Sequence, residues 1–573
     1  MNTEKKSFIL LALAFTVLMS LPFLVTGMGW TALFGLVPLL CMERIATRNG
    51  TRNFWWWHYL TFVLWNAVTT WWVCEATVGG GIFAIVANAL QMSLVFGLFR
   101  WSRRRMGGAL PYLLLAAAWL AWEKYYLTIA QISWPWLVLG NCFADTTALI
   151  QWYEVTGHMG GSLWIWASNL AIFGIITAIW EGKIKNWNAK ARIAAIAGTV
   201  AAVFGPMIWS ACIKPAPEAK EKVKVAIIQP NFDPYQKHTS MTQDQQDSVF
   251  FSILATAGEV TDSGEPSLVV GPETFTNRFI IEDYSNNTTF LRFQHWLKEH
   301  PRCNVLFGAS AYNRTYSVTQ PNILAYDLGE TYVDGARKHI WYLSRNSAII
   351  TDTTGRLDIF HKKKLVPGTE LTHYPRIFIP IEKLFGGNLI GKCAGQGGKA
   401  SALKFIDPEL EFKLGCAICY ESVYGEYCTG YVHDGADLMT VITNDAWWGN
   451  TPGYRQHFNF SRLRAIETGR TVVRCGNTGI SAIIDPDGKV LKRTEWWKPA
   501  LLTGEAGLYD GRTFFVRYGD IVGRVSVFAF ILLLLAAIFR PRKDVRRPSG
   551  RGRRSPSGSA SADRPYRNSR TSR

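Results

Sequence analysis

The 573-residue sequence lacks three patterns, and each absence removes a class of protein from consideration. Its ten cysteines show no paired-ligand spacing, so we expect no zinc site and no other metal. No small-residue cleavage site joins the first apolar run to a soluble domain, because a second apolar run follows at once. We therefore interpret residues 8 to 27 as an uncleaved membrane helix rather than a signal peptide. Charged residues are almost absent from the cores of the apolar runs, which argues against a transporter.

Positive charge is abundant, but its distribution does not indicate nucleic-acid binding. The formal net charge is +18, and residues 540 to 573 hold eleven Arg and one Lys against two Asp, so +10 of the excess lies there. Most of the remainder lies in short loops between apolar runs. We expect no nucleic-acid partner, and a disordered basic tail over residues 541 to 573, near anionic lipid on the cytoplasmic face.

Eight apolar runs are each near the length, about 20 residues, that a helix needs to cross a bilayer. Groups of tryptophans near the ends of several runs are typical of interfacial aromatic belts. The runs cover residues 8 to 27, 29 to 42, 55 to 74, 81 to 99, 109 to 128, 161 to 180, 193 to 213 and 521 to 539. The sequence thus predicts a membrane α-helical bundle of eight helices.

The loop charges predict how this bundle is oriented. Loops 43 to 54, 100 to 105 and 181 to 192 are rich in Arg and Lys, whereas the intervening loops are acidic or neutral. Because Lys and Arg prefer the cytoplasmic side, we expect both termini inside and residues 222 to 510 outside the cytoplasm. The stretch 130 to 160 is half apolar and long for a connector, so we expect it on the membrane surface, facing the soluble domain.

Residues 222 to 510 combine short apolar strands with helical stretches at 287 to 299 and 455 to 469. The expected strands are 222 to 230, 267 to 271, 304 to 309, 323 to 327, 347 to 352, 402 to 406, 412 to 419, 438 to 443, 471 to 475 and 479 to 484. This mixture predicts an α/β layered domain. The expected division is 1–221 for seven helices, 222–510 for this domain, 511–540 for the eighth helix and 541–573 for the tail.

Three residues that end or follow expected strands are candidates for one catalytic site. Cys419 ends one strand, Glu273 ends another, and Lys362 follows a third. Strand ends at one edge of an α/β sheet converge on the crevice where ligands bind. A cysteine nucleophile needs a base for its proton and a cation or donor for the developing oxyanion. Cys419 could act as the nucleophile, Glu273 as the base and Lys362 as the oxyanion partner.

Each of the three also has an ordinary interpretation. Glu273 alone could cap a helix or lie in solvent. Lys362 is one of three consecutive lysines, which usually form a solvated face. Most buried cysteines are packing residues, and Cys416 is a competing thiol on the same strand. Taken singly, such short motifs favour the ordinary interpretation.

The sequences around the three residues resemble those of the nitrilase (carbon-nitrogen hydrolase) superfamily. The whole chain to about residue 540 resembles its membrane branch, the apolipoprotein N-acyltransferases. The motifs that carry this resemblance are Gly271-Pro-Glu273, Lys362-Lys-Lys-Leu-Val-Pro-Gly-Thr-Glu370, Ile418-Cys-Tyr-Glu421, Asn444-Asp-Ala-Trp-Trp-Gly449, Gln456-His457, Arg462-Leu-Arg-Ala-Ile-Glu467 and Asn477-Thr-Gly-Ile480. For residues 222 to 510 the resemblance implies a nitrilase-like αββα sandwich.

The resemblance also implies roles for the site residues. Glu273 becomes the general base, Lys362 the oxyanion stabiliser and Cys419 the acylated nucleophile. The supporting residues are Glu370, which helps to organise the site, and Tyr420 and Glu421, which flank the nucleophile; the backbone N–H of Tyr420 is an expected oxyanion donor.

Two positions depart from the family pattern. Gly271 stands where the membrane branch usually has Trp, so one wall of the pocket is expected to differ. Gly368-Thr369 replace the usual Phe-Gly before Glu370, which weakens the assignment of Glu370 and leaves the triad untouched.

The activity that the resemblance implies is a two-step acyl transfer without a cofactor. An acyl chain moves from a membrane phospholipid to Cys419 as a thioester, and the amino group of diacylglyceryl-cysteine in an apolipoprotein accepts it. The chain is then a multi-pass monomer of the bacterial inner membrane, with its catalytic domain on the periplasmic side. Two other classes stay open: a membrane-tethered nitrilase-type amidase, in which water accepts the acyl group, and a non-catalytic sensor or transporter.

Two apolar segments of the soluble domain, 275 to 282 and 376 to 390, are unusual for exposed loops. We expect them to be mobile arms that touch lipid and exclude water, because water would hydrolyse a thioester. The alternative is that they pack on the core.

Overall fold

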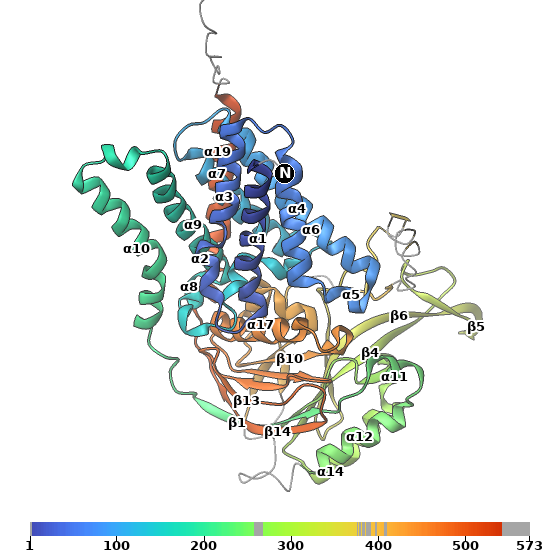
Figure 1. Cartoon of the computed structure of the whole chain (residues 1–573). Helices are drawn as coiled ribbons and strands as arrows, with labels where there is room; N and C mark the ends of the chain where they lie inside the picture. The colour runs from blue at the N-terminus through green and yellow to red at the C-terminus, as the bar shows by residue number, and fades with distance from the viewer. Residues whose placement is uncertain are drawn as a thin grey trace, which may run out of the picture.

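A bundle of long helices stands on a domain of two stacked β-sheets in the computed structural model (Figure 1). The structure describes residues 3–256, 267–374, 376–377, 380, 384, 391–395, 398–405 and 410–540. The basic tail from residue 541 onward therefore lies outside the described residues.

Helices lie at all eight of the predicted apolar runs. They are α1 (Thr3–Leu24), α2 (Ala32–Gly35) with α3 (Val37–Asn49), α4 (Phe54–Thr70), α6 (Val78–Arg103), α7 (Leu110–Thr128), α9 (His158–Trp180), α10 (Ala189–Cys212) and α19 (Ile521–Phe539). Among the described residues, six segments are long and apolar enough to cross a membrane: Thr3–Leu24, Gly29–Asn49, Val78–Arg103, His158–Trp180, Ala189–Cys212 and Ile521–Phe539. The remaining two are α4, which has 17 residues, and α7, which carries Glu123 and Lys124. Their crossing of the membrane stays a prediction.

The basic loops of the bundle meet at the end that faces away from the sheets. Residues 43 to 49, expected as part of a loop, belong to α3; its Arg44 pairs with Glu181 after α9, and Arg103 at the end of α6 pairs with its Glu43. The helix α19 ends at the same place, where the Arg105 guanidinium donates to its backbone. Three separate basic segments therefore share one face of the bundle, as expected for one side of a membrane.

Within the described residues, the second domain contains an eight-stranded and a six-stranded sheet. The strands are β1 (Glu221–Gln229), β2 (Leu268–Val270), β3 (Thr276–Ile280), β4 (Asn304–Ser317), β5 (Tyr326–Val333), β6 (Ala336–Thr351), β7 (Leu357–His361), β8 (Leu403–Phe405), β9 (Phe412–Ile418), β10 (Leu438–Thr443), β11 (Val472–Gly476), β12 (Ala482–Ile484), β13 (Val490–Arg493) and β14 (Ala500–Leu508). The first sheet has the order β14-β1-β2-β4-β6-β5, with β3 on β4 and β7 on β6. The second has the order β13-β12-β11-β10-β9-β8, and β9, β10 and β11 run parallel.

Alternating side chains on β1 explain why the sheets are layered. Val225 and Ile227 lie in the core between the two sheets, whereas Ala226 and Ile228 belong to the core under α12 (Gln243–Ala255) and α14 (Thr288–Glu299). Successive strand residues point to opposite faces, so one sheet can serve both cores. The helices α16 (Gly425–His433) and α17 (Pro452–Thr468) cover the second sheet. The resulting layers form an αββα sandwich, as predicted.

The helix α17 and the stretch between α7 and α9 join the two parts. The indole N–H of Trp136 donates to Gln456 Oε1 at 2.6 Å, and the backbone N–H of His158 donates to Glu467 Oε1 at 2.8 Å. Apolar residues of α17 share one hydrophobic core with the bundle. The prediction that residues 130 to 160 face the soluble domain is confirmed.

The prediction of two lipid-touching arms is wrong for residues 275 to 282. This segment contains β3, which pairs with β4, and its Phe275 and Phe279 are fully buried in the core under α12 and α14. The apolar side chains therefore serve the core, which was the alternative interpretation. Most of residues 376 to 390 lie outside the described residues; within them, Ile377 and Leu384 are exposed.

Candidate active site

Glu273, Lys362 and Cys419 line one cavity of about 570 Å³. Glu273 follows β2 of the first sheet, Lys362 follows β7 of the same sheet, and Cys419 follows β9 of the second sheet. The cavity therefore lies where strand ends of the two sheets meet. The structure brings together the three residues that the sequence singled out.

Two carboxylates and an amide surround the buried Lys362. Its Nζ lies 3.1 Å from Glu273 Oε1 and 2.9 Å from Glu370 Oε1. Asn346 on β6 donates through Nδ2 to the same two oxygens, at 2.7 Å each. The backbone N–H of Asn444 donates to Glu273 Oε2 at 3.0 Å. Both oxygens of Glu273 are thus held in place, and Glu370 lies directly against Lys362.

The two carboxylates keep the lysine charged. Burial by itself would lower the pKa of Lys362, but the charges of Glu273 and Glu370 outweigh it and raise that pKa well above its ordinary value. The neighbouring Lys363 and Lys364 point elsewhere: their ammonium groups lie over the rings of Phe360 and Tyr424. Lys362 is therefore the member of the lysine run that faces the cavity.

Cys419 occupies a sharp turn between β9 and the short helix η7 (Cys419–Val423). Its φ is +50°, a left-handed conformation that strains a residue with a side chain. Burial, and then the charge of Glu273, raise the pKa of its thiol, while the Lys362 ammonium opposes this shift. The resting group is therefore the neutral thiol, and attack on a substrate requires a base.

A buried charge network lies behind the turn. His457 Nε2 lies 3.2 Å from the backbone O of Cys419 and 3.0 Å from Ser422 Oγ, and its Nδ1 lies 2.8 Å from Asp445 Oδ1. The guanidinium of Arg474 donates to Asp445 Oδ2 at 2.5 Å. Although burial opposes it, the charges of His457 and Arg474 hold the pKa of Asp445 below its ordinary value. This network fixes the carbonyl of the strained residue.

The same network bears on metal binding. Among the described residues, Cys419, Asp445 and His457 offer ligand atoms within 4.8 Å of one another. However, both oxygens of Asp445 and both ring nitrogens of His457 already have hydrogen-bonding partners in the protein. The donor set therefore fits an ion-pair network, and the structure gives no reason to propose a metal there.

Glu421 connects the cysteine turn to the lysine loop. It is fully buried, and its oxygens accept the backbone N–H groups of Lys363 at 2.8 Å, Lys364 at 3.2 Å and Ile418 at 2.9 Å. The hydroxyl of Tyr427 also donates to it at 2.7 Å. One carboxylate thus holds the chain after Lys362 against the end of β9.

The cavity extends from the three residues to the membrane part. The Tyr420 hydroxyl donates to the backbone O of Ser133 at 2.7 Å, so the turn touches the stretch after α7. One face of α6 forms the far wall, through Gly80, Ala84 and Ala87. A long apolar group bound at Cys419 can therefore extend along a helix of the bundle.

Two residues near the site were missed from the sequence. Asn346 directly precedes the expected strand 347 to 352 and carries no distinctive motif; in the structure it lies within β6. Lys237 is buried and donates through Nζ to the backbone O of Thr274 at 2.5 Å, directly after Glu273. Burial lowers the pKa of Lys237 to about 8, and Glu273 opposes the shift. No sequence signal marks it, because it lies in a short polar stretch.

Glycines account for two features of the site. At Gly308 on β4, a Cβ atom would lie 2.6 Å from the Cα of Glu273, so only glycine lets the backbone of Glu273 pack this closely against β4. The departure at Gly271 does not change the cavity wall: a Cβ there would face Phe250 and Phe307 in the core. Gly368 and Thr369 do line the cavity.

Family models match most of the chain. Residues 224–512 match the carbon-nitrogen hydrolase family, and residues 15–171 match the apolipoprotein N-acyltransferase N-terminal domain. The chain is 26% identical over 527 residues to the apolipoprotein N-acyltransferase of Chlorobaculum tepidum, covering 89% of this chain and 92% of the relative. It is 27% identical over 484 residues to that of Geobacter metallireducens, covering 83% and 84%.

Among solved structures, the chain also has similarity to an amidase from Nesterenkonia sp. It is 14% identical, covers 54% of this chain and 95% of the amidase, and gives a TM-score of 0.32, which supports no inference about activity. The family matches rest on sequence instead, and they extend over both the membrane part and the soluble part. The chain belongs to the carbon-nitrogen hydrolase (nitrilase) family, within its membrane branch, the apolipoprotein N-acyltransferases.

Proposed function

We propose that the chain transfers an acyl chain from a membrane phospholipid, through a thioester on Cys419, to the N-terminal amino group of diacylglyceryl-cysteine in an apolipoprotein. The observation that carries this proposal is the cavity that joins Cys419 to the wall of α6. Both substrates are lipids, so the reaction requires a nucleophile in a cavity that reaches a membrane helix.

In the first step, Glu273 takes the thiol proton while Cys419 Sγ attacks the ester carbonyl of the phospholipid. The Lys362 ammonium and the backbone N–H of Tyr420 stabilise the oxyanion. When the intermediate collapses, the carbon–oxygen ester bond breaks, and the leaving alkoxide takes the proton from Glu273. A lysophospholipid departs, and the acyl group remains on sulfur.

In the second step, the amine of the acceptor attacks the thioester carbonyl. Glu273 takes a proton from the attacking nitrogen and returns it to the departing thiolate, so the free enzyme is restored. Glu370 and Asn346 keep Lys362 and Glu273 aligned through both steps. The hydrogen bonds of Glu421 hold the lysine loop and the cysteine turn together.

The location that fits this reaction is the bacterial inner membrane, crossed eight times, with the sandwich on the periplasmic side. The clustering of basic loops at the opposite end of the bundle supports this orientation. A membrane-tethered amidase would use the same three side chains with water as acceptor. It would not need a cavity wall formed by a membrane helix.

The decisive experiment is mass spectrometry of the purified chain after incubation with phospholipid bearing an isotope-labelled acyl group. A hydroxylamine-labile adduct is expected on the parent and on Cys416→Ala, and none on Cys419→Ala. Cys416 is a suitable control because its side chain is buried between the sheets, and burial raises its pKa to about 12. A diacylglyceryl peptide should discharge the adduct. An adduct that only water discharges would favour the amidase.

A further inference from the structure

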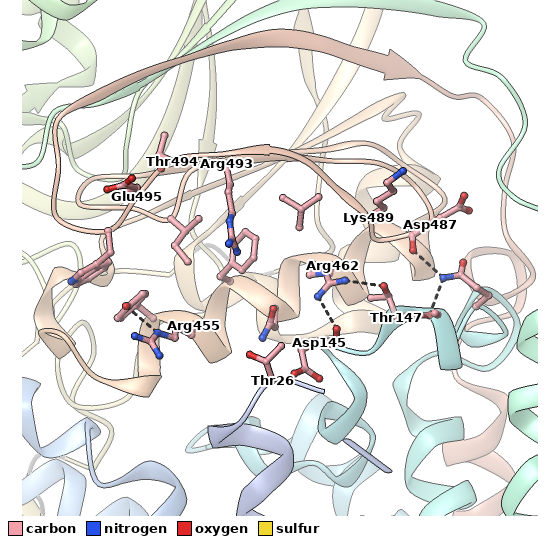
Figure 2. Close-up of a pocket in the computed structure, with 18 residues that line it drawn as sticks. Thr26, Asp145, Thr147, Arg455, Arg462, Asp487, Lys489, Arg493, Thr494 and Glu495 are labelled. Atoms are coloured by element: carbon pink, nitrogen blue, oxygen red, sulfur yellow. Dashed lines mark hydrogen bonds between the residues drawn. The ribbon is translucent and has the colours of Figure 1, made fainter. Parts of the chain in front are cut away.

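A second cavity, of about 690 Å³, lies beside α17 (Figure 2). The soluble part contributes α17 and the chain around β13, and the membrane part contributes Thr26 and residues 145 to 151. The cavity therefore lies at the level where helices of the bundle end. None of Glu273, Lys362 and Cys419 lines it.

The helix α17 separates the two cavities. Gln456 and His457 point toward the bundle joint and the cysteine turn. Arg455 and Arg462, one residue before and five residues after them, point into the second cavity, as Figure 2 shows. A ligand in this cavity therefore does not contact the acyl-transfer site.

Four cationic residues line the second cavity. Within the described part of the chain, Arg455, Arg462, Lys489 and Arg493 form no ion pair with a carboxylate. Arg462 donates only to neutral oxygens, namely Gly488 O, Asp145 O and Thr147 Oγ1. Burial lowers the pKa of Arg462; the carboxylate of Asp145 opposes this shift and the nearby Arg493 adds to it.

The three carboxylates of the lining are engaged by other groups. Glu495 pairs with Lys498, which does not line the cavity. Asp487 Oδ1 accepts the backbone N–H of Ala216, and Asp145 Oδ2 accepts that of Gly27. Burial raises the pKa of Asp145, so its negative charge is disfavoured. The cations therefore outweigh the free negative charge in the cavity.

One wall is apolar and aromatic. The rings of Tyr454 and Trp496 stack with centroids 3.8 Å apart, and Phe458, Ile480 and Val490 continue the wall. Arginine guanidinium groups match phosphate oxygens in geometry and charge. Aromatic rings beside them are typical of the membrane–water interface. The combination suits an amphiphile with a phosphate group.

We propose that this cavity binds the phosphate group of a second ligand, a membrane phospholipid or a soluble phosphate ester, at the joint between bundle and sandwich. The apolar wall and the position at the helix ends favour the lipid. The ligand would bridge α17 to residues 145 to 151 and so stabilise the joint beside the active site.

The test compares two full-length double variants in detergent, both in a Cys419→Ala background so that no acyl transfer consumes lipid. Arg455→Gln/Arg493→Gln removes two cavity cations that hold no ion pair. Arg356→Gln/Lys404→Gln removes the same charge from exposed positions outside the cavity. Native mass spectrometry measures binding of phosphatidylglycerol, and of diacylglycerol as the phosphate-free probe.

The cavity variant is expected to bind phosphatidylglycerol about tenfold more weakly than the matched variant, with unchanged diacylglycerol binding. If glycerol phosphate displaces phosphatidylglycerol and binds with a similar affinity, the ligand is a soluble phosphate ester. If glycerol phosphate does not compete, the ligand is the lipid. Equal binding of phosphatidylglycerol by the two variants would overturn the proposal. So would a loss of diacylglycerol binding in the cavity variant as large as its loss of phosphatidylglycerol binding. The readout is binding, so the result is independent of the acyltransferase proposal.

Discussion

At the residue scale, the buried ammonium of Lys362 is the most demanding feature of the site. A buried charge is costly unless it is paired, and two carboxylates pair this one. Burial, and then the charge of Glu273, raise the pKa of the nearby Cys419 thiol, and the Lys362 ammonium partly offsets this rise. The electrostatics at the nucleophile therefore depend on this one side chain.

Replacement of Lys362 by Met tests this dependence. Acyl-enzyme formation is expected to fall by about 10²–10³-fold, the usual cost of removing one oxyanion donor. The pKa of Cys419 should rise further, because the ammonium that lowers it is gone. Alkylation of Cys419 by iodoacetamide should then require a higher pH than in the parent, as measured by mass spectrometry.

The matched control is Lys364→Met, whose ammonium lies over the Tyr424 ring and outside the cavity. It should leave both the acyl adduct and the alkylation profile close to those of the parent. Equal loss in the two variants would contradict the assignment of the oxyanion role to Lys362.

The three candidate residues could be found from the sequence because each ends or follows an apolar strand and carries a family motif. Asn346 could not, although it contacts both Glu273 and Glu370. Its position follows from the pairing of β6 with β4 and β7, a contact between distant segments that no local pattern encodes. Lys237 depends in the same way on where α11 (Pro234–Thr239) packs.

At the element scale, Glu421 decides how the turn η7 and the lysine loop fit together. Burial raises the pKa of Glu421, and the backbone N–H groups of Ile418 and Lys363 oppose that shift. Glu421→Gln keeps the shape of the side chain but turns an amide N–H₂ toward those donors. We expect a loss of about 1–3 kcal/mol in the free energy of unfolding, the cost of unsatisfied buried groups.

The same variant should reduce kcat more than it changes KM, because Lys362 is displaced while the substrate cavity remains. Thermal unfolding in detergent and steady-state kinetics measure the two effects. Glu411→Gln provides the matched control, since Glu411 is exposed on the sandwich surface. An unchanged kcat in Glu421→Gln would show that the carboxylate does not position the loop.

The wall formed by α6 predicts acyl-length selectivity. Ala87→Phe places a ring in the cavity, where it competes for space with a long acyl chain. The rate of transfer of a hexadecanoyl chain should fall about tenfold, because overpacking costs about 1–2 kcal/mol of binding free energy. Transfer of a hexanoyl chain should be retained. The control is Leu90→Phe, on an exposed part of the same helix. Competition between the two donors, read by mass spectrometry of the product, gives the ratio; an unchanged ratio would remove α6 from the acyl path.

Elements with strong local patterns were predictable, and those defined by distant pairing were not. The strand β9 was expected from its apolar run, as was α19 from its length and hydropathy. By contrast, the apolar residues 275 to 282 were interpreted as a lipid-touching arm, whereas pairing with β4 and packing in the core under α12 and α14 bury Phe275 and Phe279. The edge strand β14 is likewise defined by its antiparallel partner β1, far away in the chain.

At the scale of the whole molecule, the joint between bundle and sandwich is built as a core rather than as a flexible linker. Tyr424 and Phe460 of the sandwich share one apolar cluster with helices of the bundle. His158 and Arg464 both contact the buried carboxylate of Glu467 at this joint. A joint of this kind keeps the cavity at a fixed height relative to the helix ends, as a reaction on membrane lipids requires.

The orientation of the whole molecule can be tested with cysteines placed at its two ends. Cys212 is exposed, so the parent for labelling is Cys212→Ser. In intact spheroplasts, a bulky membrane-impermeant maleimide should label Arg356→Cys, on the sandwich, and should spare Arg48→Cys, at the basic end of the bundle. Permeabilised cells should give labelling at both positions. The reverse pattern in intact spheroplasts would place the sandwich, and with it Cys419, in the cytoplasm. It would mean that the bundle is oriented against the usual preference of Arg and Lys for the cytoplasmic side, and it would contradict the proposed location.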